Sequence, residues 1–458
     1  MNRQIADVTR PSAQAERIET PTGPQNRTGN DSFVLKGTIC YSRSQTEIAV
    51  FPDSYVVCEE GFSRGVYRTL PEAYQALPLT DYGDKLILPG LVDLHTHAPQ
   101  YPFRGTGMDL ELVEWLQSRA FPEEAHYSDL DYARTAYRQF VDHLTRSATT
   151  RACVFATRHR KATELLMDLL EESGLVTFVG KVNMDRNAPE GLREASAQRS
   201  AQETRLWLTE TDGRYRRTRP ILTPRFIPSC TEALLEALGA LQREWGLPVQ
   251  SHLSENPEEI RWVKALCPQA KFYGDAYDRW GLFGRDANGR PFPTIMAHCV
   301  WSSPEEVARM RENGVFIAHC PASNTNLSSG IAPVRAYLDG GLRVGLGSDV
   351  AGGHTESLFR AMTDAIQVSK LYWRLVEQDA KPITFAEAFY LATKGGGAFF
   401  GQVGSLEAGY AFDAIVLDDS PLSHPQPLTA LQRLERAAYL SLDLFGLHAK
   451  YVAGRQLF

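Results

Sequence analysis

The sequence of 458 residues predicts an α/β protein, a (β/α)8 TIM-like barrel with a small accessory β domain built from both chain ends. Short apolar runs alternate with amphipathic stretches through the middle of the chain, as in parallel strands joined by helices. Strand-like runs broken by Gly, Pro and Asp occupy both ends. We expect a polar tail over 1–32, the first part of the accessory domain over 33–88, the barrel over 89–405 and the second part of the accessory domain over 406–458.

The first segment, residues 1–32, is polar and lacks the apolar stretch of a secretory signal, so we expect a disordered tail. The chain has a formal net charge of -7, which gives no sign of binding to nucleic acid or to anionic membranes. No apolar stretch is long enough for a transmembrane helix. Seven cysteines without CxxC spacing favour reduced thiols in a cytoplasmic protein.

The accessory domain is predicted from five runs rich in β-branched and aromatic residues. Because the runs at the two ends are alike in kind, we expect them to build one domain. Three precede the barrel and two follow it: FVLKGTICYS, EIAVFPDSYVVCEEG and DKLILPG, then YAFDAIVLDDS and KYVAGRQLF.

The barrel is predicted from eight short apolar runs. In chain order they are LVDLHTH, TTRACVF, VTFVGKV, RPILTPRF, LPVQSHL, PTIMAHC, VFIAHC and RVGLGSD. The stretches between them place apolar residues at helical spacing. Examples are Thr231–Trp245, Glu255–Cys267, Pro304–Asn313 and Glu356–Leu375.

Histidines gather at the carboxyl ends of these predicted strands. His95 and His97 are two residues apart, so both side chains lie on one side of the first strand, at the end where barrel enzymes keep their active sites. Later runs end in His252, His298, His319 and Asp349. Burying so many imidazoles without a metal would leave costly unpaired polar groups. The pattern therefore predicts a metal site, with zinc favoured and iron, cobalt or manganese possible, and a hydrolytic reaction on an activated water.

Glu255 follows His252 by three residues, and two interpretations of it stay open. Above a metal it would carry protons as a general acid and base. Beside Ser254 it would be an N-terminal helix carboxylate that interacts with the helix dipole. His319 is also open, since it either acts near the site or supports its strand.

The segment HTE, His354–Glu356, imitates the H-x-E motif of another zinc deaminase fold. That fold needs a downstream PCxxC, which the chain lacks. We therefore interpret the segment as a helix start with Thr355 as its cap.

Five motifs in order resemble the amidohydrolase superfamily: PGLVDLHTH, SHLSE, MAHC, AHCPASN and GLGSDVAGG. The resemblance covers roughly Leu88 to Asp418. Four further segments, HAPQYPFRG, LVEWL, VGKVNMD and TPRF, are similar to the branch that deaminates guanine. The resemblance implies a hydrolase that converts guanine to xanthine and ammonia in purine catabolism, with one zinc ion per chain, and a cytoplasmic homodimer.

The same resemblance assigns a role to each site residue. It implies His95, His97, His252 and Asp349 as metal ligands and Glu255, His298 and Asp349 as catalytic residues. It implies that the purine is bound by Gln100, Arg225, Phe226 and His252. Arg and Gln side chains suit guanine because they can pair with the acceptors and the donor on its edge.

A single metal is expected because the fourth run ends in Arg225, where binuclear members carry a carboxylated lysine. Lys181 is given no metal role. Trp115 is interpreted as core packing in preference to stacking on the ring. Two alternatives stay open: hydrolysis of another aminated ring such as a triazine, pterin or cytosine, and a barrel without catalysis that serves as a scaffold.

Overall fold

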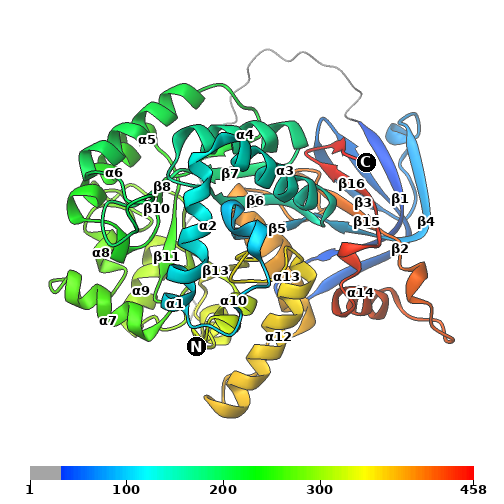
Figure 1. Ribbon diagram of the computed structural model, residues 1–458. Coiled ribbons are helices and arrows are strands. Elements are labelled where there is room, and N and C mark those ends of the chain that lie inside the picture. Colours follow the sequence, from blue (N-terminus) through cyan, green and yellow to red (C-terminus); the bar gives the residue numbers. More distant parts are fainter. Residues whose placement is uncertain (1–31) are drawn as a thin grey trace, which may run out of the picture. The chain divides into compact units, whose positions relative to one another are not determined.

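The computed structural model describes residues 32–458, which belong to one compact unit. The predicted disordered tail, apart from Ser32, lies outside the described residues. Strands and helices are both abundant, so the α/β prediction is confirmed (Figure 1). None of the described helices is both long and apolar enough to cross a membrane.

Strands from the two ends of the chain share one seven-stranded sheet, in the order β17-β16-β15-β4-β1-β2-β3. β4 is the junction, since it pairs in parallel with β1 and antiparallel with β15, where Leu88 lies opposite Ile415. Figure 1 shows the N-terminal strands in blue beside the C-terminal ones in red. The strands are β1 Phe33–Ser42, β2 Ile48–Glu59, β3 Phe62–Tyr67, β4 Leu79–Pro89, β15 Ala414–Leu417, β16 Leu447–Val452 and β17 Arg455–Gln456.

The middle of the chain contains two parallel four-stranded sheets, β5-β6-β7-β9 and β11-β12-β13-β14, with the short pair β8 and β10 between them. Most of these strands are buried on both faces, which explains why they read as continuous apolar runs. The strands are β5 Leu91–His97, β6 Thr149–Phe155, β7 Val176–Gly180, β8 Val182–Asn183, β9 Thr218–Pro220, β10 Thr223–Pro224, β11 Val249–Leu253, β12 Thr294–His298, β13 Phe316–His319 and β14 Arg343–Leu346.

Hydrogen bonds join the two parallel sheets at both edges. On one edge Gln250 N donates to Leu222 O over 2.9 Å. On the other edge Asp349 N donates to His95 O over 2.8 Å, and His97 N donates to Val350 O over 3.0 Å. The first predicted strand is therefore adjacent to the last one, and their carboxyl ends meet.

The longer helices lie outside the parallel strands, as Figure 1 shows for α3, α4, α5 and α6. The helices are α1 Leu112–Trp115, α2 Phe121–Ala125, α3 Leu130–Arg146, α4 Arg160–Ser173, α5 Ala197–Thr211, α6 Glu232–Trp245, α7 Pro257–Leu266, α8 Asp275–Asp278, α9 Pro304–Asn313, α10 Pro321–Asn326, α11 Val334–Asp339, α12 Leu358–Leu375, α13 Phe385–Tyr390 and α14 Ala430–Tyr439. Shorter 3-10 and π turns are η1 Glu72–Tyr74, η2 Ala98–Phe103, η3 Leu116–Ala120, η4 His126–Ser128, η5 Ile227–Ser229, η6 Leu391–Gly395, η7 Ala398–Phe400, η8 Ser420–Leu422 and η9 Leu442–Leu444.

The predicted cap of α12 is wrong by two residues. Ser357, not Thr355, caps this helix, and its Oγ accepts from the backbone N of Arg360. The Thr355 hydroxyl instead accepts from the backbone N of Ser357 over 3.2 Å. Asp443 explains the position of the cap, because its carboxylate accepts from the Ser357 hydroxyl over 2.7 Å and so fixes Ser357 at the helix start.

The burial of Asp443 makes the free energy of unfolding of the chain depend on pH. Its carboxyl is fully buried, and burial raises its pKa from the ordinary 3.8 to about 6. The folded chain therefore keeps a proton on Asp443 between about pH 4 and pH 6, where the unfolded chain has released it. The stability linked to that proton is fully present below about pH 4 and is lost as the pH rises through about 6.

We expect Asp443→Asn to remove this pH dependence, because an amide does not titrate. The free energy of unfolding of the original chain should fall, relative to the variant, by about 3 kcal/mol between about pH 4 and pH 7. Urea unfolding of both chains across this range measures the difference. A constant offset between the two stability curves would contradict the assignment.

Candidate active site

The structure brings four side chains that the sequence singles out into one cluster. His95 and His97 end β5, His252 lies on β11, and Asp349 follows β14. His97 Nε2 lies 3.3 Å from His95 Nε2 and 3.2 Å from His252 Nε2. Asp349 Oδ1 lies 3.1 Å from His95 Nε2 and 3.3 Å from His97 Nε2.

These spacings fit a metal ion. Four ligands placed tetrahedrally at zinc bond lengths of about 2.0–2.1 Å would lie about 3.3 Å from one another. His95, His97 and Asp349 form one candidate metal-binding group, and His95, His252 and His298 form an overlapping one. Converging ring nitrogens are unfavourable in a buried site unless something accepts their lone pairs. The donor set and its geometry therefore suit a divalent cation.

The protonation states also suit a metal. Burial lowers the pKa of His97 to about 4 and also lowers the pKa values of His95 and His252. Burial acts against ionisation of Asp349, but His95 and His97 outweigh it and hold the pKa of the carboxyl well below its usual range. Neutral imidazoles and an ionised carboxylate are the forms that bind metals. His252 Nδ1–H donates a hydrogen bond to the Arg225 carbonyl over 2.6 Å, which leaves the lone pair of Nε2 free for a metal.

Asp93 is a supporting residue that the sequence reasoning missed. Its buried carboxylate accepts from Ser348 Oγ over 2.6 Å, from Ser348 N over 3.0 Å and from His95 N over 3.1 Å. It thereby links the histidine strand to the loop that carries Asp349. Its place two residues before His95, on the same side of the strand, was the available signal.

Glu255 and His298 lie beside the cluster. Glu255 Oε2 is 3.4 Å from His298 Nε2, without hydrogen-bond geometry, and His298 Nδ1 is 2.8 Å from Asn324 Oδ1. Burial, together with the negative charge of Asp349, raises the pKa of Glu255 to about 8. At neutral pH this carboxyl therefore holds a proton at the edge of the pocket.

Glu255 precedes α7 but does not cap it, so its interaction with the helix dipole stays a prediction. Asn256 caps α7 and forms a capping box with Glu259. Glu259 Oε2 accepts from the backbone N of Glu255 over 3.1 Å, so the neighbouring carboxylate serves the helix start. The Glu255 side chain is left to face the pocket, where Ser329 Oγ donates to it over 3.2 Å.

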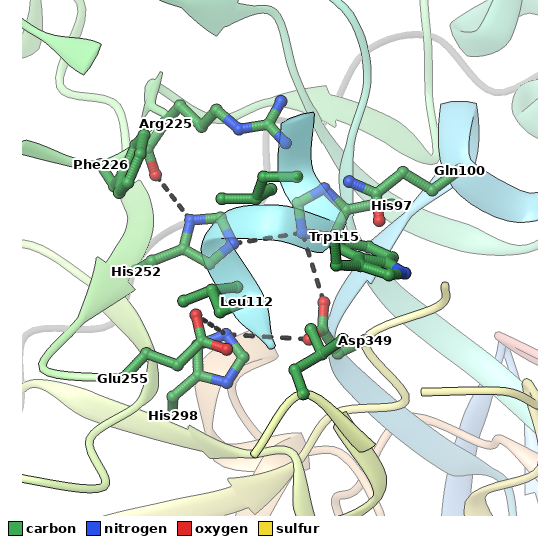
Figure 2. Close-up of a pocket in the computed structure, with 12 residues that line it drawn as sticks. His97, Gln100, Leu112, Trp115, Arg225, Phe226, His252, Glu255, His298 and Asp349 are labelled. Atoms are coloured by element: carbon green, nitrogen blue, oxygen red, sulfur yellow. Dashed lines mark hydrogen bonds and ion pairs between the residues drawn. The ribbon is translucent and has the colours of Figure 1, made fainter. Parts of the chain in front are cut away.

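The predicted substrate residues line the same pocket. Figure 2 shows the Arg225 and Gln100 side chains toward one end of the pocket and Glu255 with His298 toward the other. Phe226 lines the wall next to Arg225. The structure thus brings possible purine contacts and the histidine cluster into one cavity.

Glu124 of α2 is the second residue that the sequence reasoning missed. Gln100 Nε2 donates to Glu124 Oε1 over 2.9 Å, and Arg225 forms an ion pair with Glu124 Oε2. Nothing in the segment FPEEAH distinguishes this glutamate from surface ones, because its partners come from distant parts of the chain.

Three further residues have mixed outcomes. Trp115 is buried, packs at 5.6 Å between ring centroids against Phe103 and also lines the pocket, so its core interpretation stays a prediction. His319 is buried, and its Nδ1 has no hydrogen-bond partner among residues 32–458. Lys181 forms a buried ion pair with Glu194 over 2.7 Å, which accounts for it without a metal.

Comparisons with known proteins show which family the chain resembles. The model of the Amidohydrolase family matches residues 86–441. Guanine deaminase of Dictyostelium discoideum is 35% identical over 452 residues, 93% of this chain and 98% of that protein. Guanine deaminase of Homo sapiens is 39% identical over 346 residues, 74% of each chain.

Two solved structures extend the comparison. The guanine deaminase from C. acetobutylicum with bound guanine in its active site is 43% identical, with a TM-score of 0.89 over 93% of this chain and 100% of that one. E. coli guanine deaminase is 28% identical, with a TM-score of 0.81 over 93% of this chain and 99% of that one.

Proposed function

This chain belongs to the amidohydrolase family, and from that premise we propose that its pocket deaminates guanine hydrolytically to xanthine and ammonia. One observation carries the proposal most directly. The histidine and aspartate cluster shares a single cavity with an arginine and a glutamine, the side chains suited to a purine edge. Relatives and solved structures named as guanine deaminases, similar over most of the chain, support it.

One zinc ion per chain would be held by His95, His97, His252 and Asp349. Bound there, it would act as a Lewis acid that lowers the pKa of water and supplies a nucleophile at neutral pH. Arg225 supports the expectation of one ion, since its guanidinium stays cationic and cannot be carboxylated as a bridging lysine can.

We assign the reaction to three residues, Glu255, His298 and Asp349. The nucleophile attacks C2 of guanine, the carbon that carries the amino group. The Glu255 carboxyl, protonated at neutral pH by its raised pKa, gives a proton to the ring nitrogen beside that carbon. Asp349 and then Glu255 accept the proton of the attacking water, and His298 orients that water. Glu255 passes this proton to the amino group, which leaves as ammonia, and recovers its own proton from the new hydroxyl as the tetrahedral centre collapses to xanthine.

The purine is oriented by Arg225, Gln100, Phe226 and His252. Arg225 supplies donors to the ring acceptors, while the Gln100 amide offers both a donor and an acceptor. Phe226 packs on the ring face, and His252 contacts the ring from the metal side. A buried polar site of this kind binds adenine poorly, because adenine would leave polar groups of Arg225 and Gln100 unpaired.

We infer that the two joined parallel sheets form a closed eight-stranded barrel over 89–405, with the seven-stranded sheet as the core of an accessory domain over 33–88 and 406–458.

The chain would act in purine catabolism as a cytoplasmic homodimer. Its seven cysteines, all buried and without CxxC spacing, support a reducing compartment. Exposed Leu371, Leu375 and Val376 at the end of α12 support an interface.

Ultraviolet spectroscopy of purified, metal-analysed protein tests the function. We expect guanine to be converted to xanthine with about one metal ion per chain, and adenine, cytosine and a triazine to react far more slowly. Turnover of another ring in place of guanine would favour a different deaminase or a chlorohydrolase. Protein that holds no metal and transforms nothing would favour the scaffold interpretation.

A further inference from the structure

Glu124 is buried behind Gln100 and Arg225, two side chains that line the pocket. Its side chain is 1% exposed, and its two carboxylate oxygens serve two different partners. One oxygen accepts from Gln100 and the other pairs with Arg225, side chains that are themselves only 2% and 3% exposed. A single buried carboxylate thus contacts both of the polar residues that are proposed to bind the purine edge.

The contact fixes which way the Gln100 amide points. Its Nε2 donates to Glu124 over 2.9 Å, and its Oε1 accepts from the backbone N of Ala351 over 3.2 Å. A carboxylate can only accept, and a backbone N–H can only donate, so a flipped amide would lose both bonds. Gln100 therefore presents one N–H and one lone pair to the pocket in a defined order.

The same contact compensates the charge of Arg225. The guanidinium lies 5.0 Å above the ring of Phe121, which stands three residues before Glu124 on α2. α2 thus covers one face of Arg225 and supplies its counter-charge. The Glu124 carboxylate balances the charge of the Arg225 guanidinium. The remaining donors of Arg225 therefore face the pocket from an ion pair with no net charge.

We propose that Glu124 is a positioning residue that makes the purine edge of this pocket selective for a neutral ring over an anionic one. The inference rests on the proposed function and deepens it. Guanine is neutral near pH 7, whereas the product, with a second ring carbonyl, gives up a proton more readily. By neutralising Arg225, Glu124 weakens the hold on the product anion and so favours its release.

The decisive variant is Glu124→Gln, which keeps the shape and removes the charge. Its amide can accept from only one of the two partners, and Arg225 becomes an uncompensated cation. We expect KM for guanine to rise about tenfold or more. The ratio of the xanthine dissociation constant to the KM for guanine should be about tenfold lower in the variant than in the original chain. The decrease should be larger at about pH 8 than at about pH 6.

Two further variants separate charge from packing. Glu194→Gln is the matched control, since Glu194 is a buried glutamate paired with a buried cation outside the pocket. It should change stability and leave the ratio of the two constants unchanged. Glu124→Asp keeps the charge and should raise KM without a new preference for the anion. Metal content is measured throughout, because Arg225 also holds His252 through its carbonyl.

Xanthine binding by calorimetry requires no turnover, so it can be read separately from the reaction. If the original chain binds xanthine but does not transform guanine, the proposed function fails and the binding comparison still judges Glu124. If Glu124→Gln weakens guanine and xanthine equally at both pH values, the residue only packs the pocket and the inference is overturned. A shift toward the anion in Glu124→Asp would also overturn it.

Discussion

Replacing Glu255 by Gln is expected to lower kcat for guanine about 10³-fold while the bound metal stays at the original level. Glu255 Oε2 lies 3.4 Å from His298 Nε2, and the carboxyl has its pKa raised to about 8, so it can hold and deliver a proton at neutral pH. The amide keeps the shape and the contact with Ser329 but cannot exchange a proton. The effect should therefore fall on kcat far more than on KM.

Steady-state kinetics with metal analysis of the same preparation measures this result. Glu194→Gln serves as the control, because it makes the same chemical change in a buried glutamate away from the pocket. If the Glu255 variant retains more than about a tenth of the original kcat, another group carries the proton.

Replacing His97 by Ala is expected to abolish metal binding and activity together. His97 Nε2 lies within 3.3 Å of three other proposed metal-ligand atoms, which belong to His95, His252 and Asp349. Loss of residues that merely support a ligand costs about 10–100-fold in metal affinity, so loss of a ligand should cost more than about 100-fold. The melting temperature should fall as well, because a bound ion stabilises the fold that holds it.

Metal content by mass spectrometry and turnover by absorbance check this expectation. His448→Ala is a fair control, since it removes an exposed histidine that packs edge-on against Tyr82 in the seven-stranded sheet. A His97 variant that keeps a full complement of metal and its activity would contradict the ligand assignment.

Much of the architecture could be predicted because its signals are local. The run LVDLHTH coincides with β5, FVLKGTICYS with β1, and the predicted helix Pro304–Asn313 with α9. Buried parallel strands are continuously apolar, and their polar carboxyl ends stand out against that background. The histidines at these ends were therefore visible, and the cluster is where the spacing placed it.

The missed features depend on contacts that sequence spacing does not encode. Glu124 lies in an ordinary acidic helix segment, and its role comes from Gln100 and from Arg225, which lies far along the chain. Thr355 resembles a cap as much as Ser357 does, and Asp443 decides between them from the last part of the chain. The predicted fourth run is divided into β9 and β10, both too short for their apolar pattern to define.

The pairing of β4 with β15 has a consequence for synthesis on the ribosome. Leu88 finds its partner Ile415 only after the whole region of parallel strands has emerged. At about 5–20 residues per second, the edge of β4 stays open for roughly 15–65 s. An open strand edge is a template for wrong pairing with other chains. Because β1 pairs with the opposite edge of β4, we expect the nascent chain to need chaperone cover of this edge until its last segment arrives.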